Sequence, residues 1–339
     1  MKHVLVSCLI VLGLSPLLAQ NEAALAAYNQ GISEYNNKDF QSAVQSFDKA
    51  IQADSAFTKA WFNRAVCKTD LKDYTGAVND YARCLKIGGD DSKTIYFLAQ
   101  ARFLNNDKEG ALSDFIKAGQ LDSKNAEAHF YAGGIYFEKG EYANAVEKFT
   151  AAIRAKSDFA DAYNDRGSAK LKLEDVKGAI EDYREATKLN AKMAVAYNNL
   201  AAALRQSGDL QGALQEFNYS ILADPTMSTS YVKRGRLKMD MQDLEGAMND
   251  FNKAIQLNAK DQYAYNNRGC LKNKQRDFAG AVADFDLAIR INPSYGYAYL
   301  NRGIAKENLR DLAGACKDWS EAAENGVEAA KQFRDTECN

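Results

Sequence analysis

Charged residues recur together at fixed distances in five segments of the chain, and they are the side chains with the most evident chemistry. In each segment an arginine is followed four residues later by a lysine and sixteen residues later by an aspartate. A guanidinium fork and an ammonium group that share one carboxylate can lock two chain segments in register. Segments without the arginine generally lack its partners, so the sets predict internal ion pairs and not a ligand site. They are Arg64, Lys68 and Asp80; Arg166, Lys170 and Asp182; Arg234, Lys238 and Asp250; Arg268, Lys272 and Asp284; and Arg302, Lys306 and Asp318.

No combination of residues has the pattern of a catalytic centre. His129 is the one histidine beyond position 3, at a place that aromatic residues fill elsewhere, which favours a packing role. We find no Ser–His–Asp set, no metal-ligand spacing and no glycine-rich phosphate loop. The net charge of -2 also argues against binding to a nucleic-acid backbone. The sequence predicts a non-enzymatic protein without a cofactor, a metal or a small-molecule substrate.

The charged sets keep their phase because one 34-residue pattern runs nine times without insertion or deletion. Within each unit place 8 is Gly or Ala, place 16 is acidic, place 20 is Ala and place 24 is aromatic, as in Gly31, Asp39, Ala43 and Phe47. The alanine and the aromatic residue lie on one helical face, and the acid suits a helix N-terminus. Each unit therefore predicts two helices stacked on the next pair. The units are 24–57, 58–91, 92–125, 126–159, 160–193, 194–227, 228–261, 262–295 and 296–329.

These places, with Ala at most places 27 and Pro225 and Pro293 at place 32, resemble the tetratricopeptide repeat. The resemblance implies an all-α fold, a right-handed superhelical α-solenoid, closed here by a capping helix and tail at 327–339. No Gly-, Ser- or Pro-rich linker interrupts the units, so we expect one elongated array. The family also implies a scaffold that binds a protein or peptide partner on its concave surface. Its chaperone-type carboxylate clamp is not implied, because place 5 never holds Lys.

In this family the concave surface is lined by places 2, 5, 6, 9, 12 and 13 of the first helices. Units 1 to 4 supply aromatic side chains there, which suit apolar side chains of a peptide. Later units supply amides and basic groups, which suit a polar or anionic stretch. We therefore expect one partner segment, apolar at one end and acidic at the other. The candidate partner-binding residues are Tyr28, Tyr35, Phe62, Tyr96, Phe103, Phe130, Phe137, Asn164, Asn198, Arg205, Arg236 and Asn266.

Two alternatives remain open from the sequence. The aromatic residues could pack between neighbouring first helices and present no trough. The protein could also be a structural, self-assembling array without a peptide ligand. Asparagines at place 6, among them Asn63, Asn199 and Asn301, resemble a ladder that grips a peptide backbone, although other residue types interrupt the series.

Residues 1–19 lie outside the repeats and have the pattern of a secretory signal, with Lys2 before an apolar run that ends at Ala19. Residues 20–23 form a short lead-in. The pattern predicts an exported protein, periplasmic or secreted, of a bacterial cell envelope. The alternative is an uncleaved anchor, although the run falls short of the roughly 20 residues of a spanning helix.

An oxidising compartment permits disulfides, which makes the cysteines informative. Cys316 lies where the other units have an aliphatic residue that should face the next helix. In an antiparallel arrangement, similar chain lengths run from the intervening turn back to Cys316 and on to Cys338, at about 1.5 Å per residue. We therefore predict a disulfide between Cys316 and Cys338. Cys67 and Cys84 are expected to be buried thiols, although their pairing stays open, and Cys270 should face the groove.

Overall fold

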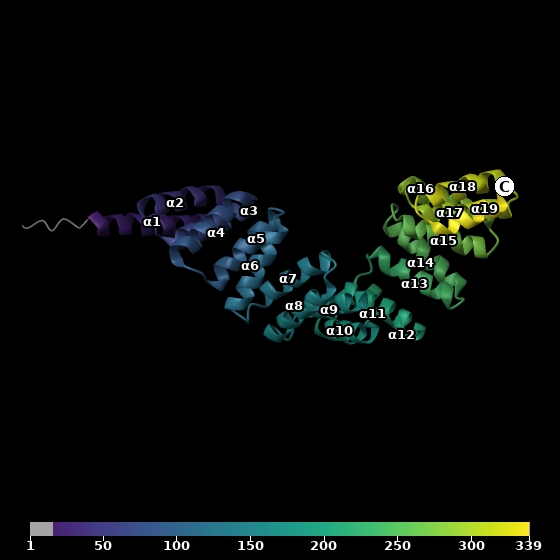
Figure 1. The fold of residues 1–339 in the computed structure, drawn as a ribbon, viewed down its shortest axis with the longest axis horizontal. Coiled ribbons are helices and arrows are strands. Elements are labelled where there is room, and N and C mark those ends of the chain that lie inside the picture. The colour runs from purple at the N-terminus through teal and green to yellow at the C-terminus, as the bar shows by residue number, and fades with distance from the viewer. Residues whose placement is uncertain (1–15, 339) are drawn as a thin grey trace, which may run out of the picture. The chain divides into compact units, whose positions relative to one another are not determined.

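The computed structural model describes residues 16–338, and it divides the chain into two compact units, Met1–Ser157 and Asp158–Asn339. The sequence predicted one continuous array, and no change in composition marks the boundary, which falls in the turn between the eighth and ninth helices. All regular elements of the described residues are α-helices. Within each unit, consecutive helices form antiparallel pairs that stack on the following pair (Figure 1).

The first unit contains four helix pairs among its described residues. Its helices are α1 (Pro16–Asn36), α2 (Phe40–Ala53), α3 (Thr58–Asp70), α4 (Tyr74–Gly88), α5 (Ser92–Leu104), α6 (Lys108–Leu121), α7 (Ala126–Glu138) and α8 (Tyr142–Ala155).

The second unit contains five helix pairs and one further helix at its end, again counted over the described residues. Its helices are α9 (Ala160–Lys172), α10 (Val176–Leu189), α11 (Ala194–Gln206), α12 (Leu210–Ala223), α13 (Ser228–Asp240), α14 (Leu244–Leu257), α15 (Gln262–Lys274), α16 (Phe278–Ile291), α17 (Gly296–Asn308), α18 (Leu312–Glu324) and α19 (Glu328–Glu337).

Most of the predicted signal, residues 1–15, lies outside the described residues. The described chain begins at Pro16, so the last signal residues share helix α1 with the first helix of repeat 1. None of the described helices combines the length and the apolar character that crossing a bilayer requires.

The acid at place 16 caps the second helix of the repeats, as the sequence predicted. Asp73, for example, accepts a hydrogen bond from the backbone N–H of Gly76 at 2.9 Å. Such a bond satisfies one of the orphan donors of a helix N-terminus. Glu141 is the exception, because its longer side chain makes no capping bond and instead accepts from the Asn144 amide at 2.8 Å.

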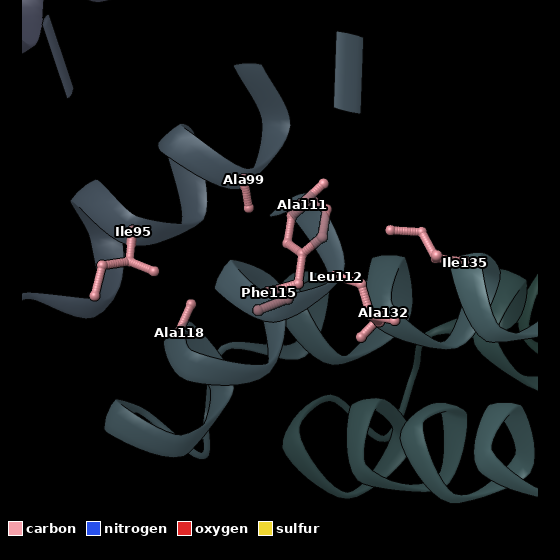
Figure 2. Close-up of a cluster of buried hydrophobic side chains, with 9 residues drawn as sticks. Ile95, Ala99, Ala111, Leu112, Phe115, Ala118, Ala132 and Ile135 are labelled. Atoms are coloured by element: carbon pink, nitrogen blue, oxygen red, sulfur yellow. The ribbon is translucent and has the colours of Figure 1, made fainter. Parts of the chain in front are cut away.

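The core of each repeat forms where the small residue at place 8 meets the aromatic residue at place 24. A Cβ on Gly31 would lie 2.7 Å from the ring of Phe47, so in this repeat even alanine would require the ring to shift. Phe115 of α6 packs in the same way among Ala99 of α5 and Ala132 of α7 (Figure 2). The alternation of small and large residues therefore sets the spacing of the helices that carry the candidate site residues.

Candidate interaction surfaces

The five charged sets form ion pairs between the two helices of a repeat, which confirms the prediction. In repeat 2, Arg64 donates from Nε and Nη2 to the two carboxylate oxygens of Asp80 at 2.7 and 2.6 Å. Lys68 Nζ lies 2.8 Å from Oδ2 of the same carboxylate. The equivalent bonds recur in the sets of Arg166, Arg234, Arg268 and Arg302. These arginines are therefore engaged inside the repeats and are not a ligand surface.

The remaining Nη1 of several of these arginines reaches back to place 25 of the preceding repeat, a contact that the sequence analysis missed. Arg234 donates to the Asn218 amide oxygen at 2.7 Å, and Arg268 donates to that of Asn252 at 2.7 Å. Arg64 and Arg302 make the same contact with Asp48 and Asp286. The available signal was the amide or acid at place 25. Each arginine therefore links three helices.

In repeat 3 the aspartate at place 23 pairs with a different basic residue. Asp114 had no arginine at place 7 to pair with, and the structure pairs it with Arg102 of place 11, whose Nη1 lies 2.8 Å away. Burial nevertheless raises the pKa of Asp114, although Arg102 and Lys117 oppose that change. Asp114 thus has one cationic partner among the described ion pairs, where the aspartate of each complete set has two.

The place-5 aromatic residues of the first unit are half-buried and pack against the core. The rings of Tyr28, Phe62, Tyr96 and Phe130 lie 5.4 to 5.8 Å from the place-24 ring of their own repeats. Phe62 also lies 5.3 Å from Phe97 of the next repeat. Such contacts support the alternative that these rings pack between helices, although each keeps part of its surface exposed.

The place-12 aromatic residues Tyr35, Phe103 and Phe137 are half-buried as well. Tyr35 and Phe137 each lie against a ring at the start of the next helix, Phe40 at 5.4 Å and Tyr142 at 5.3 Å. Phe103 packs on the cluster of Figure 2. Burial is the main reason why the pKa of Tyr35 is raised, and Asp70 raises it further. These rings therefore contribute to the packing of the helix pairs.

A cavity of about 450 Å³ in the first unit brings two of the predicted aromatic residues together. Tyr28 and Phe62 line it with Asn63, Lys59 and Lys93, next to the Gly88–Gly89 turn. The Asn63 amide donates to the Tyr28 hydroxyl at 2.8 Å, and Lys93 Nζ lies 5.2 Å from the Phe62 ring centre. Tyr35 lines a smaller cavity of about 250 Å³. The linings of these two cavities do not include Tyr96, Phe103, Phe130 or Phe137.

The predicted asparagines of the second unit are buried, which corrects their placement on an open groove. Asn164, Asn198 and Asn266 are only 5%, 3% and 6% exposed. Asn164 and Asn266 accept hydrogen bonds from Asn199 at 2.9 Å and Asn301 at 3.0 Å.

Asn198 differs, because its amide nitrogen donates to Ser230 at 2.7 Å while its oxygen has no hydrogen-bond partner among the described residues. A place-5 amide is buried because the first helix of the next repeat covers it. Several place-6 asparagines thus hold neighbouring repeats together, and they leave few groups to grip a peptide.

The two predicted arginines of the second unit differ in what surrounds them. Arg205 is paired with Asp240, whose Oδ2 lies 2.6 Å from Nη2. Arg236 is exposed and makes no ion pair with the described residues. It lines a cavity of about 750 Å³, together with Asn266, Tyr263, Cys270 and Tyr297. None of the three tyrosines that line this cavity was among the predicted site residues, although Tyr263 and Tyr297 occupy place 2, a groove place in this family.

The structure joins Cys316 and Cys338 in a disulfide, with their Cα atoms 5.7 Å apart. The bond lies beside the stacked rings of Trp319 and Phe333, which hold α19 against α18. Cys67 and Cys84 are free and buried, and Cys270 is free at the wall of the larger cavity.

His129 packs against Gly119 of α6, where an added Cβ would lie 2.5 Å from the imidazole. Burial is the main cause that lowers its pKa. Among the residues that the structure describes, no group of His, Cys, Asp and Glu could hold a metal ion.

Several solved structures share this fold. One is the C-terminal part of a TPR repeat-containing protein of Cytophaga hutchinsonii, with a TM-score of 0.60 and 14% identity, covering 71% of this chain and 98% of that one. A tetratricopeptide repeat protein of Parabacteroides merdae has a TM-score of 0.60 and 18% identity, covering 73% and 99%. The pilF protein of Pseudomonas aeruginosa has a TM-score of 0.54 and 19% identity, covering 62% and 96%. At these identities the likeness concerns the fold alone.

A search of curated proteins found no match. Family models described as "TPR repeat" match residues 133–174, and models described as "Tetratricopeptide repeat" match 14–57, 28–92, 164–228, 228–261 and 263–295. Together the matched segments span more than half of the chain. The nine-fold register, the helix pairs and these matches agree, and the chain belongs to the tetratricopeptide repeat family, whose members are generally non-enzymatic scaffolds for protein interaction.

Proposed function

We propose that this protein is a non-catalytic scaffold that binds a peptide segment of a partner protein on its first helices. The observation that carries the proposal is the cavity of about 450 Å³ beside Tyr28 and Phe62. Half-buried rings at a cavity wall offer apolar surface that a bound side chain can cover. Membership of the family also supports the proposal, since its repeats generally serve protein interaction.

The lining suits an apolar side chain of an extended peptide. The Phe62 ring packs against Tyr81 and Phe97, with ring centres 5.4 and 5.3 Å apart, so its position is fixed before a ligand binds. Fixed side chains lose little entropy on binding. The exposed Lys59 and Lys93 at the rim provide hydrogen-bond donors for the peptide main chain or for an acidic residue.

We further propose that the protein works in a cell envelope, after export. The support is the sequence pattern of residues 1–19 together with the disulfide between Cys316 and Cys338, a bond typical of oxidising compartments. Mass spectrometry of the protein from fractionated cells tests both points. We expect an N-terminus close to residue 20 in the envelope or the medium, and an intact N-terminus in the cytosol would contradict export.

Peptide selection tests the proposed function directly. We would immobilise the full chain, select from displayed 12-residue peptides and titrate the enriched sequences by calorimetry. Replacing Phe62 by leucine keeps an apolar side chain but removes the ring, so affinity should fall about two- to tenfold. The matched control is Phe103→Leu, also a half-buried ring of a first helix but outside the lining of this cavity.

Two outcomes would count against peptide binding at this site. One is equal affinity of the Phe62→Leu and Phe103→Leu variants. The other is the absence of any enriched peptide, combined with a mass in light scattering that grows with protein concentration. The second outcome would favour the self-assembling array.

A further inference from the structure

The cavity of about 750 Å³ in the second unit is built by three successive first helices. Helix α13 contributes Arg236 and Asp240, α15 contributes Tyr263 and Asn267, and α17 contributes Tyr297. Because these helices belong to neighbouring repeats of one unit, their packing positions the lining before a ligand binds.

Two aromatic side chains of this cavity are more exposed than the half-buried candidate rings of the first unit. Tyr263 and Tyr297 keep 54% and 59% of their surface exposed. Tyr295 lies between them, with ring centres 5.3 Å from Tyr263 and 6.4 Å from Tyr297. Three neighbouring rings, two of them more than half exposed, form a platform on which an apolar or aromatic side chain can stack.

The lining holds one cation, Arg236, and one carboxylate, Asp240, and only the carboxylate has an ion-pair partner among the described residues. Asp240 is neutralised by Arg205 at 2.6 Å, whereas Arg236 has no carboxylate partner among the described residues. Burial raises the pKa of the Cys270 thiol to about 11 and that of Tyr295 to about 12, so neither of these two groups adds a negative charge near neutral pH. An unpaired guanidinium fork favours a carboxylate, which it can bind with two parallel hydrogen bonds.

The side-chain amide of Asn267 completes the lining. It forms no hydrogen bond within the part of the chain that the structure describes, whereas the equivalent Asn199 and Asn301 are engaged with the preceding repeat. The cause is local, because place 5 of the preceding repeat is Val232, which offers no acceptor. A free amide can donate to and accept from a peptide main chain.

We propose that this cavity binds an acidic residue and a nearby apolar residue of an extended peptide. The carboxylate pairs with Arg236, the apolar side chain stacks on the exposed rings of Tyr263 and Tyr297, and the main chain contacts Asn267. The inference rests on the proposed function, because it names the peptide class that the second unit selects. Charge complementarity decides for an acidic peptide over a neutral one.

Matched peptides test the role of the carboxylate. The probes are fluorescein-labelled octapeptides with one Phe and one Glu at three spacings in a Gly/Ser background, each with a partner that has Gln in place of Glu. Fluorescence anisotropy with the full chain should show at least one Glu peptide binding tenfold or more tightly than its Gln partner. The Arg236→Gln variant should lose that preference. Arg290→Gln removes the same charge from α16, outside the cavity, and should keep it.

Cys270 reports whether the peptide occupies this cavity. The free cysteines Cys67 and Cys84 are buried, so a maleimide should label Cys270 first, and the Cys270→Ser variant should lose that adduct. A saturating Glu peptide should slow the labelling several-fold, and the same concentration of its Gln partner should not.

The inference is wrong if all Glu and Gln peptides bind equally, if none binds, or if the preference survives in Arg236→Gln. It is also wrong if the Glu peptide leaves the labelling rate of Cys270 unchanged. These results leave the proposed function intact when selected peptides still depend on Phe62. If selection also yields no peptide, both proposals fail.

Discussion

Replacing Asp284 by asparagine keeps the shape of the side chain but removes the carboxylate that Arg268 and Lys272 share. Asp284 is 2% exposed and accepts from Arg268 at 2.9 and 2.6 Å, while Lys272 Nζ lies 2.8 Å away. The substitution leaves two cations at a partly buried site without a counter-charge. Breaking a buried pair in this way typically costs about 3 to 5 kcal/mol of unfolding free energy.

The lower end of that range applies here. The side chains of Arg268 and Lys272 remain 19% and 22% exposed, so water partly hydrates the released charges. We expect Asp284→Asn to lower the unfolding free energy by about 3 kcal/mol. The matched control is Asp286→Asn on the same helix, which removes a carboxylate that is 45% exposed and pairs with Arg302. That change should cost no more than about 1 kcal/mol.

Urea unfolding followed by circular dichroism gives the overall change, and hydrogen exchange of α15 and α16 gives the local one. Both are needed because repeat arrays can unfold in steps. If Asp284→Asn costs no more than Asp286→Asn, the reasoning about the buried pair is refuted.

A triple variant that replaces all three charged residues separates the net contribution of the ion pairs to stability from the cost of leaving charges unpaired. Repeat 6 has Leu200 and Leu204 at the places of Arg268 and Lys272, both buried. Arg268→Leu and Lys272→Leu together with Asp284→Ala should therefore recover most of the loss, to within about 1.5 kcal/mol of the natural protein. A triple variant as unstable as Asp284→Asn would mean that the ion pairs themselves stabilise the repeat.

Three further perturbations test the packing, the disulfide and the charges. Gly133→Ala places a Cβ 2.7 Å from Phe149 and should destabilise the first unit by about 1 to 3 kcal/mol in urea unfolding. The adjacent Gly134→Ala meets nothing within 4 Å inside α7 and should instead stabilise by about 0.5 to 1 kcal/mol, so equal effects would contradict the packing. Cys338→Ser removes the disulfide, which closes a loop with a sequence separation of 22 and stabilises the fold by about 3 kcal/mol. Hydrogen exchange should become faster in α19 but not in α15. Unchanged exchange in α19 would show that packing alone holds this helix. Burial raises the pKa of Glu216, opposed by Arg184, so its protonated form is favoured in the fold and stability falls as the pH rises from the ordinary glutamate value through the raised one. Urea unfolding across that range should show this fall, Glu216→Gln should remove it, and an unchanged pH dependence in the variant would contradict the assignment.

The repeat pattern made the fold predictable at the level of single residues. A residue type that returns every 34 positions has to suit the same environment each time, so Gly31, Asp73 and Ala43 indicated close approach, a cap and a core position from their spacing alone. The charged sets were predictable for the same reason, because the members vary together. Glu141 shows the limit of this reasoning, since its charge fits a cap but its length does not.

The candidate surface was harder to predict, because it depends on contacts between repeats and not within them. Asn164 and Asn266 occupy groove places, yet their burial follows from the asparagines that the next repeats place over them. Tyr263 and Tyr297 were missed because their exposure is a property of the neighbouring helices. Arg236 was chosen correctly as a groove residue, whereas the pairing of Arg205 with Asp240 depends on a residue 35 positions away.

The backward contact of the arginines bears on how fragments of this protein should be cut. A fragment that starts at Gln262 contains Arg268 but not Asn252, so one guanidinium nitrogen of its first repeat has no acceptor. Starting one helix earlier, at Leu244, keeps that acceptor within the fragment. Fragments therefore keep all contacts of their first arginine when they also include the second helix of the preceding repeat, and swapped or duplicated segments should carry that extra helix.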